Sequence, residues 1–211
     1  MKKIFSLIFI FLLLPSISFS HPGGLDRNGG HTDKKTGVYH LHKTKTSSLA
    51  PQVRTAYNRE DWPHWTDDDS DCQDTRAEIL IRDNTGTIKY KRNKPCNVSW
   101  GKWVCPYTGK EFTKASDLDI DHIVPLSHAH KTGGADWSRE KKRDFANDPL
   151  NLLAVDDDIN KEKSDQAPDE WRPPLKSYWP EYARKWRKVK QKYGLYISPA
   201  EEAALKDMER H

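Results

Sequence analysis

The residues best suited to chemistry lie within positions 119–165. Asp121 and His122 are adjacent, Asn151 follows, and Asn160 precedes a Lys-Glu-Lys-Ser-Asp sequence. A histidine accepts a proton well near neutral pH, and carboxylate and amide oxygens suit a hard divalent cation such as Mg²⁺. Hydrolysis of a phosphodiester needs both functions, because the attacking water must lose a proton and the added negative charge must be offset.

Two strands and a helix would position these side chains. Residues 118–124 alternate in polarity, which is typical of a strand, and His122 falls near its end. We predict a second strand over 150–155 and a helix over 156–164 that carries Asn160. Adjacent side chains on a strand diverge, so Asp121 can hold an ion while His122 faces the attacking water.

The pattern Asp-His-Ile-Val-Pro, then Asn, then Asn-Lys-x-Lys-Ser-Asp resembles the ββα-metal motif of HNH nucleases, with its core over residues 117–165. It resembles most closely an exported HNH family related to the C-terminal domain of the GmrSD restriction enzymes. That resemblance is carried by segments at 71–76, 106–109, 118–122, 145–148, 151–154 and 170–174.

The resemblance implies a role for each motif residue. His122 corresponds to the general base, Asp121 and Asn160 to metal ligands, and Asn151 to the residue that orients the base and holds the hairpin. Lys163 corresponds to a lysine near the scissile phosphate. One divalent ion is implied, with Mg²⁺ favoured over Mn²⁺ or another ion, and the products would carry a 3′-hydroxyl and a 5′-phosphate.

The flanking sequence predicts further helices and a small antiparallel sheet. We expect helices over 74–82, over 138–146 and over 181–193, the last ending at Gly194. A capping box with proline at its first helical position opens another helix at Ser198. Short strands are expected over 87–91 and 98–104, with a turn over 106–109. The fold class is therefore α+β.

The N-terminus has the features of an export signal. Lys2 and Lys3 precede a short apolar run, and Ser18 and Ser20 are the small residues of a cleavage site. We predict a signal peptide over 1–20, a His- and Gly-rich segment over 21–42, a linker over 43–52 and the nuclease domain over 53–211. The protein would be periplasmic or secreted, without stable membrane association after cleavage, and its oligomeric state is left open.

The His- and Gly-rich segment ends in Tyr39-His40-Leu41-His42 and resembles small exported modules that end in Tyr-His-Tyr-His. His31, His40 and His42 could form a second metal site, with Zn²⁺ as its ion. A flexible His-rich tail that binds metal loosely is the alternative.

Three cysteines, Cys72, Cys96 and Cys105, leave the pairing open. A disulfide fits an exported protein, and we favour Cys72–Cys96. No Cys-x-x-Cys pair is present, which argues against a zinc site clamped by cysteines.

The net charge of +4 falls to +2 without Lys2 and Lys3, so the distribution of charge matters more than its total. Basic residues gather on the predicted helix 181–193, whose outward face suits either nucleic acid or solvent. The aspartates at 156–158 suit a helix N-terminus better than a metal, and His128 and His130 suit a loop.

The expected function is hydrolysis of DNA with little sequence specificity, with RNA left open as a substrate. Two alternatives remain at this point. One is an exported nucleic-acid-binding protein that does not cut, and the other is a metal-binding protein whose N-terminal histidines carry the function.

Overall fold

The structure is a computed structural model that describes residues 30–32, 39–41 and 56–211. The chain divides into two compact units, Met1–Val53 and Arg54–His211. The predicted signal peptide, the linker, His42 and most of the His- and Gly-rich segment lie outside the described residues. In the first unit, β1 (Gly30–Thr32) pairs antiparallel with β2 (Tyr39–Leu41), with His31 opposite His40.

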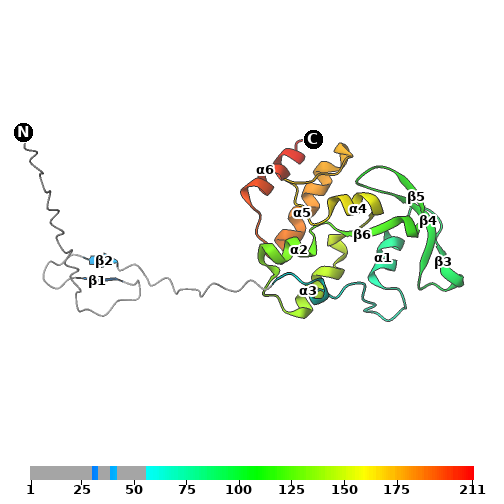
Figure 1. The fold of residues 1–211 in the computed structure, drawn as a ribbon, viewed down its shortest axis with the longest axis horizontal. Helices are drawn as coiled ribbons and strands as arrows, with labels where there is room; N and C mark the ends of the chain where they lie inside the picture. The colour runs from blue at the N-terminus through cyan, green and yellow to red at the C-terminus, as the bar shows by residue number, and fades with distance from the viewer. Residues whose placement is uncertain (1–29, 33–38, 42–55) are drawn as a thin grey trace, which may run out of the picture. The chain divides into compact units, whose positions relative to one another are not determined.

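A two-stranded hairpin and a helix form the centre of the second unit. Strand β6 (Leu118–His122) pairs antiparallel with β7 (Leu152–Asp156), with His122 opposite Leu152. Helix α4 (Asp157–Lys163) follows directly. It contacts both strands, as does α1 (Thr75–Arg82), and the two helices lie on opposite sides of β6 (Figure 1). The predicted ββα arrangement is therefore present.

A second sheet lies beyond the start of β6 (Figure 1). It has the antiparallel order β3 (Lys89–Tyr90), β4 (Val98–Val104) and β5 (Glu111–Lys114). The strand expected over 87–91 is shorter, because a 3₁₀ turn (η2, Lys91–Asn93) with a left-handed Arg92 ends it. A disulfide joins Cys72 to Cys96, and Cys105 is free and buried, which confirms the favoured pairing.

The remaining helices cover the other end of β6. They are α2 (Leu126–Ala129), a π-helical turn η4 (His130–Gly134), α3 (Arg139–Asn147), α5 (Trp179–Tyr193) and α6 (Pro199–Met208). Short 3₁₀ turns are η1 (Arg59–Asp61), η3 (Ala115–Asp117), η5 (Pro149–Asn151) and η6 (Lys176–Tyr178).

Local capping explains where these helices begin and end. The Ser138 side chain accepts from the Lys141 amide, and Ser198 forms the expected capping box with Glu201. Gly194 ends α5 with φ of 67°, a left-handed conformation that glycine adopts without strain. The α+β fold class, the starts of α3 and α6 and the end of α5 are confirmed, while α5 begins at Trp179, two residues before the expected Glu181.

Bulky aromatic side chains fill the core between the hairpin and the C-terminal helices. Trp62, Tyr107, Phe145, Tyr182 and Trp186 are each almost completely buried. Tyr107 and Tyr182 pack edge to face at 5.6 Å between ring centroids, a preferred geometry for aromatic pairs. This core fixes the base of the hairpin on which the candidate catalytic residues lie.

Candidate active site

The end of β6 and the later half of α4 border a cavity of about 420 Å³. Asp121, His122 and Asn160 all line it. Two residues that precede α1, Tyr57 and Arg59, also line it. The structure thus brings the predicted base and both predicted metal ligands to one place.

His122 is held as a neutral imidazole. Its Nε2 lies 2.8 Å from the backbone oxygen of Ala146, and its ring stacks on Trp65 with an interplanar angle of 12°. Because a carbonyl oxygen can only accept, we assign the ring proton to Nε2, which leaves the Nδ1 lone pair unprotonated. Burial lowers the His122 pKa from 6.5 to about 3, so the base form persists at neutral pH.

Asn151 fastens the loop that follows His122. Its fully buried side chain accepts from the Val124 amide at 2.8 Å and donates to the Val124 oxygen at 3.2 Å. The Ile123 amide also donates to the Asn151 backbone oxygen at 2.8 Å. These bonds join the chain after β6 to the start of β7, and so fix the end of the strand that carries His122.

Asp121 is held from both sides in the interior. The Tyr107 hydroxyl donates to its Oδ2 at 2.5 Å, and the Lys163 ammonium donates to its Oδ1 at 2.8 Å. Lys163 also donates to the His122 backbone oxygen at 2.9 Å. Burial raises the pKa of Asp121, although the nearby ammonium opposes that rise.

The expected place of Lys163 beside the scissile phosphate needs correction. Its side chain is fully buried, and its ammonium is shared between Asp121 and the backbone of His122. Burial lowers its pKa, with Asp121 opposing. An ammonium in this position orients the carboxylate and the end of β6, and it is not displayed to a phosphate in the cavity.

Asn160 contacts a carboxylate, that of Asp119, which the sequence did not lead us to select as a metal ligand. Its amide Nδ2 donates to Asp119 Oδ2 at 3.2 Å, which leaves its Oδ1 for another partner. Asp119 is two residues before Asp121 and therefore on the same face of β6. Burial raises the pKa of Asp119, and its neighbour Asp157 adds to the rise while Asn160 opposes it. Strand alternation was the signal that could have identified Asp119.

The oxygen donors that β6 and α4 bring together fit a hard divalent cation. Asp119, Asp121 and Asn160 offer only carboxylate and amide oxygens, the donors that Mg²⁺ and Mn²⁺ prefer. A carboxylate has about four lone-pair positions, and the bonds to Tyr107 and Lys163 use two of those of Asp121. Burial raises the pKa values of both aspartates, and a bound cation would favour their charged forms.

Arg59 is a second residue that sequence reasoning missed. It lines the same cavity, and its Nη2 lies 3.4 Å from Nε2 of His64. Within residues 56–211 its guanidinium has no carboxylate partner. More than sixty residues separate Arg59 from His122 in the sequence, so only folding of the chain brings it to the cavity.

The matched family gives this geometry its context. Residues 74–208, from the cap of α1 to the end of α6, match the family described as "GmrSD restriction endonucleases, C-terminal domain". The chain belongs to this family. An "Uncharacterized secreted protein" of Arthroderma benhamiae is 45% identical over 164 residues, which cover 76% of this chain and 78% of that protein. Membership of the GmrSD C-terminal domain family indicates a nuclease-type function.

The basic helix of this GmrSD C-terminal domain differs from the sequence expectation. Of its six basic side chains, only Lys188 makes no ion pair within the described residues. The pairs are Arg184 and Lys185 with Glu181, Arg187 with Glu202 and Glu209, Lys190 with Glu201, and Lys192 with Asp148. Lys190 is also fully buried. Helix α5 therefore does not present the free basic face that its sequence suggested.

His128 and His130 lie in α2 and η4, not in the loop that the sequence suggested, and Asp156 lies at the start of α4. His128 lies 2.8 Å from the Lys190 ammonium and packs on Trp186, and His130 packs against Tyr57. Asp156 caps α4 by accepting from the Asp158 amide. No described helix is long and apolar enough to cross a bilayer.

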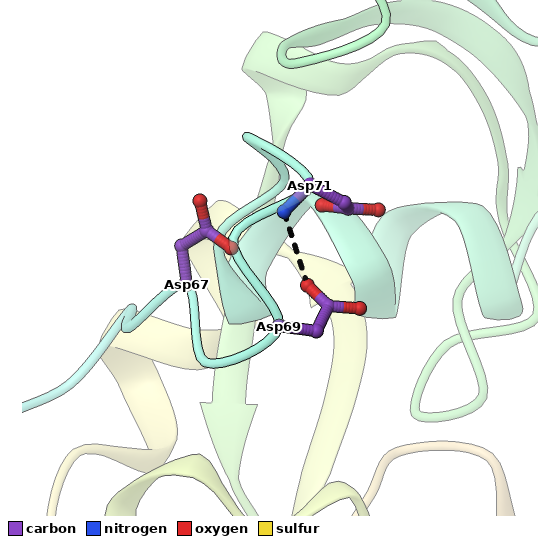
Figure 2. A group of neighbouring side chains, drawn as sticks. All are labelled: Asp67, Asp69 and Asp71. Carbon is purple, nitrogen blue, oxygen red and sulfur yellow. Dashed lines mark hydrogen bonds between the residues drawn. The ribbon is translucent and has the colours of Figure 1, made fainter.

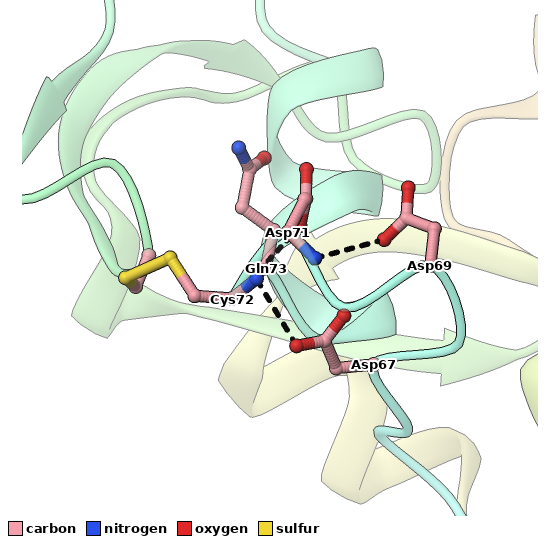
Figure 3. Close-up of a disulfide and its surroundings, with 6 residues drawn as sticks. Asp67, Asp69, Asp71, Cys72 and Gln73 are labelled. Atoms are coloured by element: carbon pink, nitrogen blue, oxygen red, sulfur yellow. Dashed lines mark hydrogen bonds between the residues drawn. A yellow bond between two sulfur atoms is a disulfide. The ribbon is translucent and has the colours of Figure 1, made fainter.

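An exposed carboxylate cluster precedes α1 and does not line the cavity at Asp121 and His122. Oxygens of Asp67, Asp69 and Asp71 lie within 4.8 Å of one another (Figure 2). Asp69 accepts from the Asp71 amide at 3.3 Å, and Asp67 accepts from the Cys72 amide at 3.1 Å beside the disulfide (Figure 3). These bonds order the loop that leads to the helix cap at Asp74.

Proposed function

We propose that this chain is an exported, metal-dependent HNH endonuclease that hydrolyses phosphodiester bonds in DNA with little sequence specificity. RNA is a second possible substrate of the same chemistry. The observation that carries the proposal is the shared cavity, where a neutral His122 adjoins the oxygen donors Asp121 and Asn160. A general base beside a hard-cation site is the combination that phosphodiester hydrolysis requires.

His122 would act as the general base through Nδ1. The Ala146 carbonyl holds the ring by its Nε2 proton and would stabilise the imidazolium formed when Nδ1 accepts a proton from water. Stacking on Trp65 restricts rotation of the ring. The pKa of about 3 belongs to the metal-free cavity without substrate, and a phosphate nearby would raise it by favouring the cation.

A divalent ion, with Mg²⁺ favoured and Mn²⁺ as the alternative, would be held by Asp121 and Asn160, with Asp119 beside them. When bound, it would offset negative charge on the phosphate and on the leaving oxygen. Lys163 and Tyr107 would keep the Asp121 carboxylate in position. Arg59, which lines the same cavity and has no carboxylate partner among the described residues, would contact a phosphate oxygen.

Export is supported by three features. The N-terminus has the pattern of a signal peptide, the Cys72–Cys96 disulfide suits an oxidising compartment, and the Arthroderma benhamiae relative is named a secreted protein. The zinc site at His31, His40 and His42 remains a proposal, supported only by the pairing of His31 with His40 along the backbone.

The test is cleavage of plasmid DNA, single-stranded DNA and RNA by the mature protein in Mg²⁺, in Mn²⁺ or in EDTA. We expect cutting that needs the metal and leaves 5′-phosphate ends. A variant without residues 21–50 should still cut, because the candidate site lies wholly in the second unit. Folded protein that binds DNA but cuts with no ion would contradict the proposal and favour a DNA-capture protein.

A further inference from the structure

The hairpin of β3 and β4 lies in a stretch of the chain that has no acidic residue. From Thr85 to Lys110 the sequence contains no aspartate or glutamate. Six basic residues fall in this stretch: Lys89, Lys91, Arg92, Lys94, Lys102 and Lys110. A run of one sign on a small sheet produces a local positive potential that the modest net charge of the chain does not reveal.

Most of these charges are exposed and unneutralised. Lys102 pairs with Glu111 at 3.1 Å, and Lys110 approaches Asp156 at 3.7 Å. The other four make no ion pair with any residue that the structure describes, and all four are exposed. Helix α5 shows the opposite arrangement, since five of its six basic side chains are paired. The hairpin of β3 and β4 therefore carries a group of positive charges that are unpaired among the described residues, whereas those of α5 are mostly paired.

Trp100 lies among these basic side chains. It is 47% exposed on β4, and the Lys114 ammonium lies 5.7 Å from the centre of its ring. Trp100 lines two adjacent hollows, one of about 320 Å³ shared with Lys91 and Lys114, and one of about 720 Å³ shared with Lys89 and Arg92. The one carboxylate in these hollows, Asp74, is engaged in capping α1.

One nucleic-acid strand is long enough to contact both the sheet and the candidate active-site cavity. Ser116 lines the smaller hollow, and β6 begins two residues later and leads to Asp121. Five residues of largely extended chain span about 15 Å, which equals about four or five nucleotides of a stacked strand. Figure 1 shows β3, β4 and β5 grouped at the end of the domain where β6 begins.

We propose that this surface, formed by Lys89, Lys91, Arg92, Lys94, Trp100 and Lys114 and here called the sheet surface, binds the substrate strand several nucleotides from the bond that is cut. The basic side chains would contact backbone phosphates, and the exposed indole would stack on a base. A polymer that alternates phosphates with planar rings satisfies both features at once. The proposal rests on the proposed function for the class of substrate.

The test measures DNA binding in EDTA, where no cutting occurs, by fluorescence anisotropy of a labelled 30-nucleotide strand over a series of salt concentrations. The double variant Lys91→Gln/Lys114→Gln is compared with Lys141→Gln/Lys188→Gln. Each removes two positive charges, and each removes one lysine that lies over a tryptophan ring, since Lys141 lies over Trp137 at 4.5 Å.

For the sheet-surface double variant we expect the slope of log Kd against log salt to become shallower by about 1.4, about 0.7 for each lost contact with a single strand, with Kd raised about tenfold or more. The matched control should retain the slope of the unmodified protein. Trp100→Ala should weaken binding about tenfold, and Trp100→Phe should restore most of it, because stacking tolerates any aromatic ring.

Equal losses in the two double variants would overturn the proposal, because they would show only a dependence on total charge. The proposal would also be overturned if the protein bound a phosphate polymer without bases tightly and the Trp100→Ala variant bound DNA as tightly as the unmodified protein. The expected pattern in a protein that cuts no DNA in Mg²⁺ would support the sheet surface while overturning the proposed endonuclease. The two proposals can therefore fail separately.

Discussion

The Lys163 ammonium lies 2.8 Å from Oδ1 of Asp121, and neither side chain has more than slight exposure to solvent. A buried ion pair is costly to break from one side, because the remaining charge has neither water nor a partner. Lys163 follows Asn160 on α4, and Asp121 precedes His122 on β6. One ion pair therefore fixes the helix with a candidate metal ligand to the strand with the candidate base.

Lys163→Met should destabilise the protein by about 3–5 kcal/mol, because it leaves the Asp121 carboxylate unpaired. The double variant Lys163→Met/Asp121→Asn should recover much of that stability but no cleavage activity. Urea unfolding and plasmid cleavage measure the two effects. A fully active Lys163→Met protein would show that the pair has no part in positioning the site.

The burial of His122 predicts a dependence of stability on pH. Its pKa is about 3 in the folded chain against 6.5 unfolded, so the unfolded chain binds the extra proton first as the pH falls. Stability is then lost progressively below pH 6.5, by about 2–3 kcal/mol at pH 4.5. His122→Gln removes the titrating group and should flatten this part of the profile. Parallel profiles from denaturation at pH 7.5, 5.5 and 4.5 would contradict the assignment.

Arg59 should contribute to catalysis through the phosphate. We expect Arg59→Ala to lower kcat/KM about tenfold to a hundredfold, the range for loss of a charge-assisted hydrogen bond. Arg59→Lys should recover only part of the lost kcat/KM, because an ammonium cannot form the two parallel hydrogen bonds of a guanidinium. Arg210→Ala, which removes an exposed arginine that pairs with Asp207 near the C-terminus, is the matched control and should cut normally.

The disulfide should stabilise the domain and the basic hairpin together. Cys72 lies in the loop before α1, and Cys96 follows the basic turn at Lys91–Asn93. Cys72→Ser/Cys96→Ser should lower the free energy of unfolding by about 2–4 kcal/mol. Thermal unfolding with and without a reductant measures the change, and Cys105→Ser is the comparison. A reductant that leaves the Tm of the unmodified protein unchanged would count against this role.

Much of the fold could be predicted because its signals are local. The caps at Ser138 and Ser198 and the stop at Gly194 depend on residues within one turn of the helix. The hairpin and α4 followed from alternation and from spacing. The strand near Lys89 was placed but its length was not, because the left-handed Arg92 that ends it has no sequence signal of its own.

The candidate site was predictable only where one motif encoded it. Asp121, His122 and Asn160 come from a short stretch, and the cavity contains all three. The environment of Lys163 and the approach of Arg59 depend on contacts between distant segments, and neither is visible in the local pattern. The same limit applies to α5, where three of the positive charges pair with acids from elsewhere in the chain, as in the Arg187–Glu202 pair.

The central claim is that His122 is the general base, and single-turnover cleavage in Mg²⁺ tests it most directly. We expect His122→Ala to slow cleavage about 100- to 10,000-fold while DNA binding is unchanged. His211→Ala, which removes an exposed histidine at the C-terminus, should cut at the rate of the unmodified protein. A folded His122→Ala protein that cuts at that same rate would contradict the account.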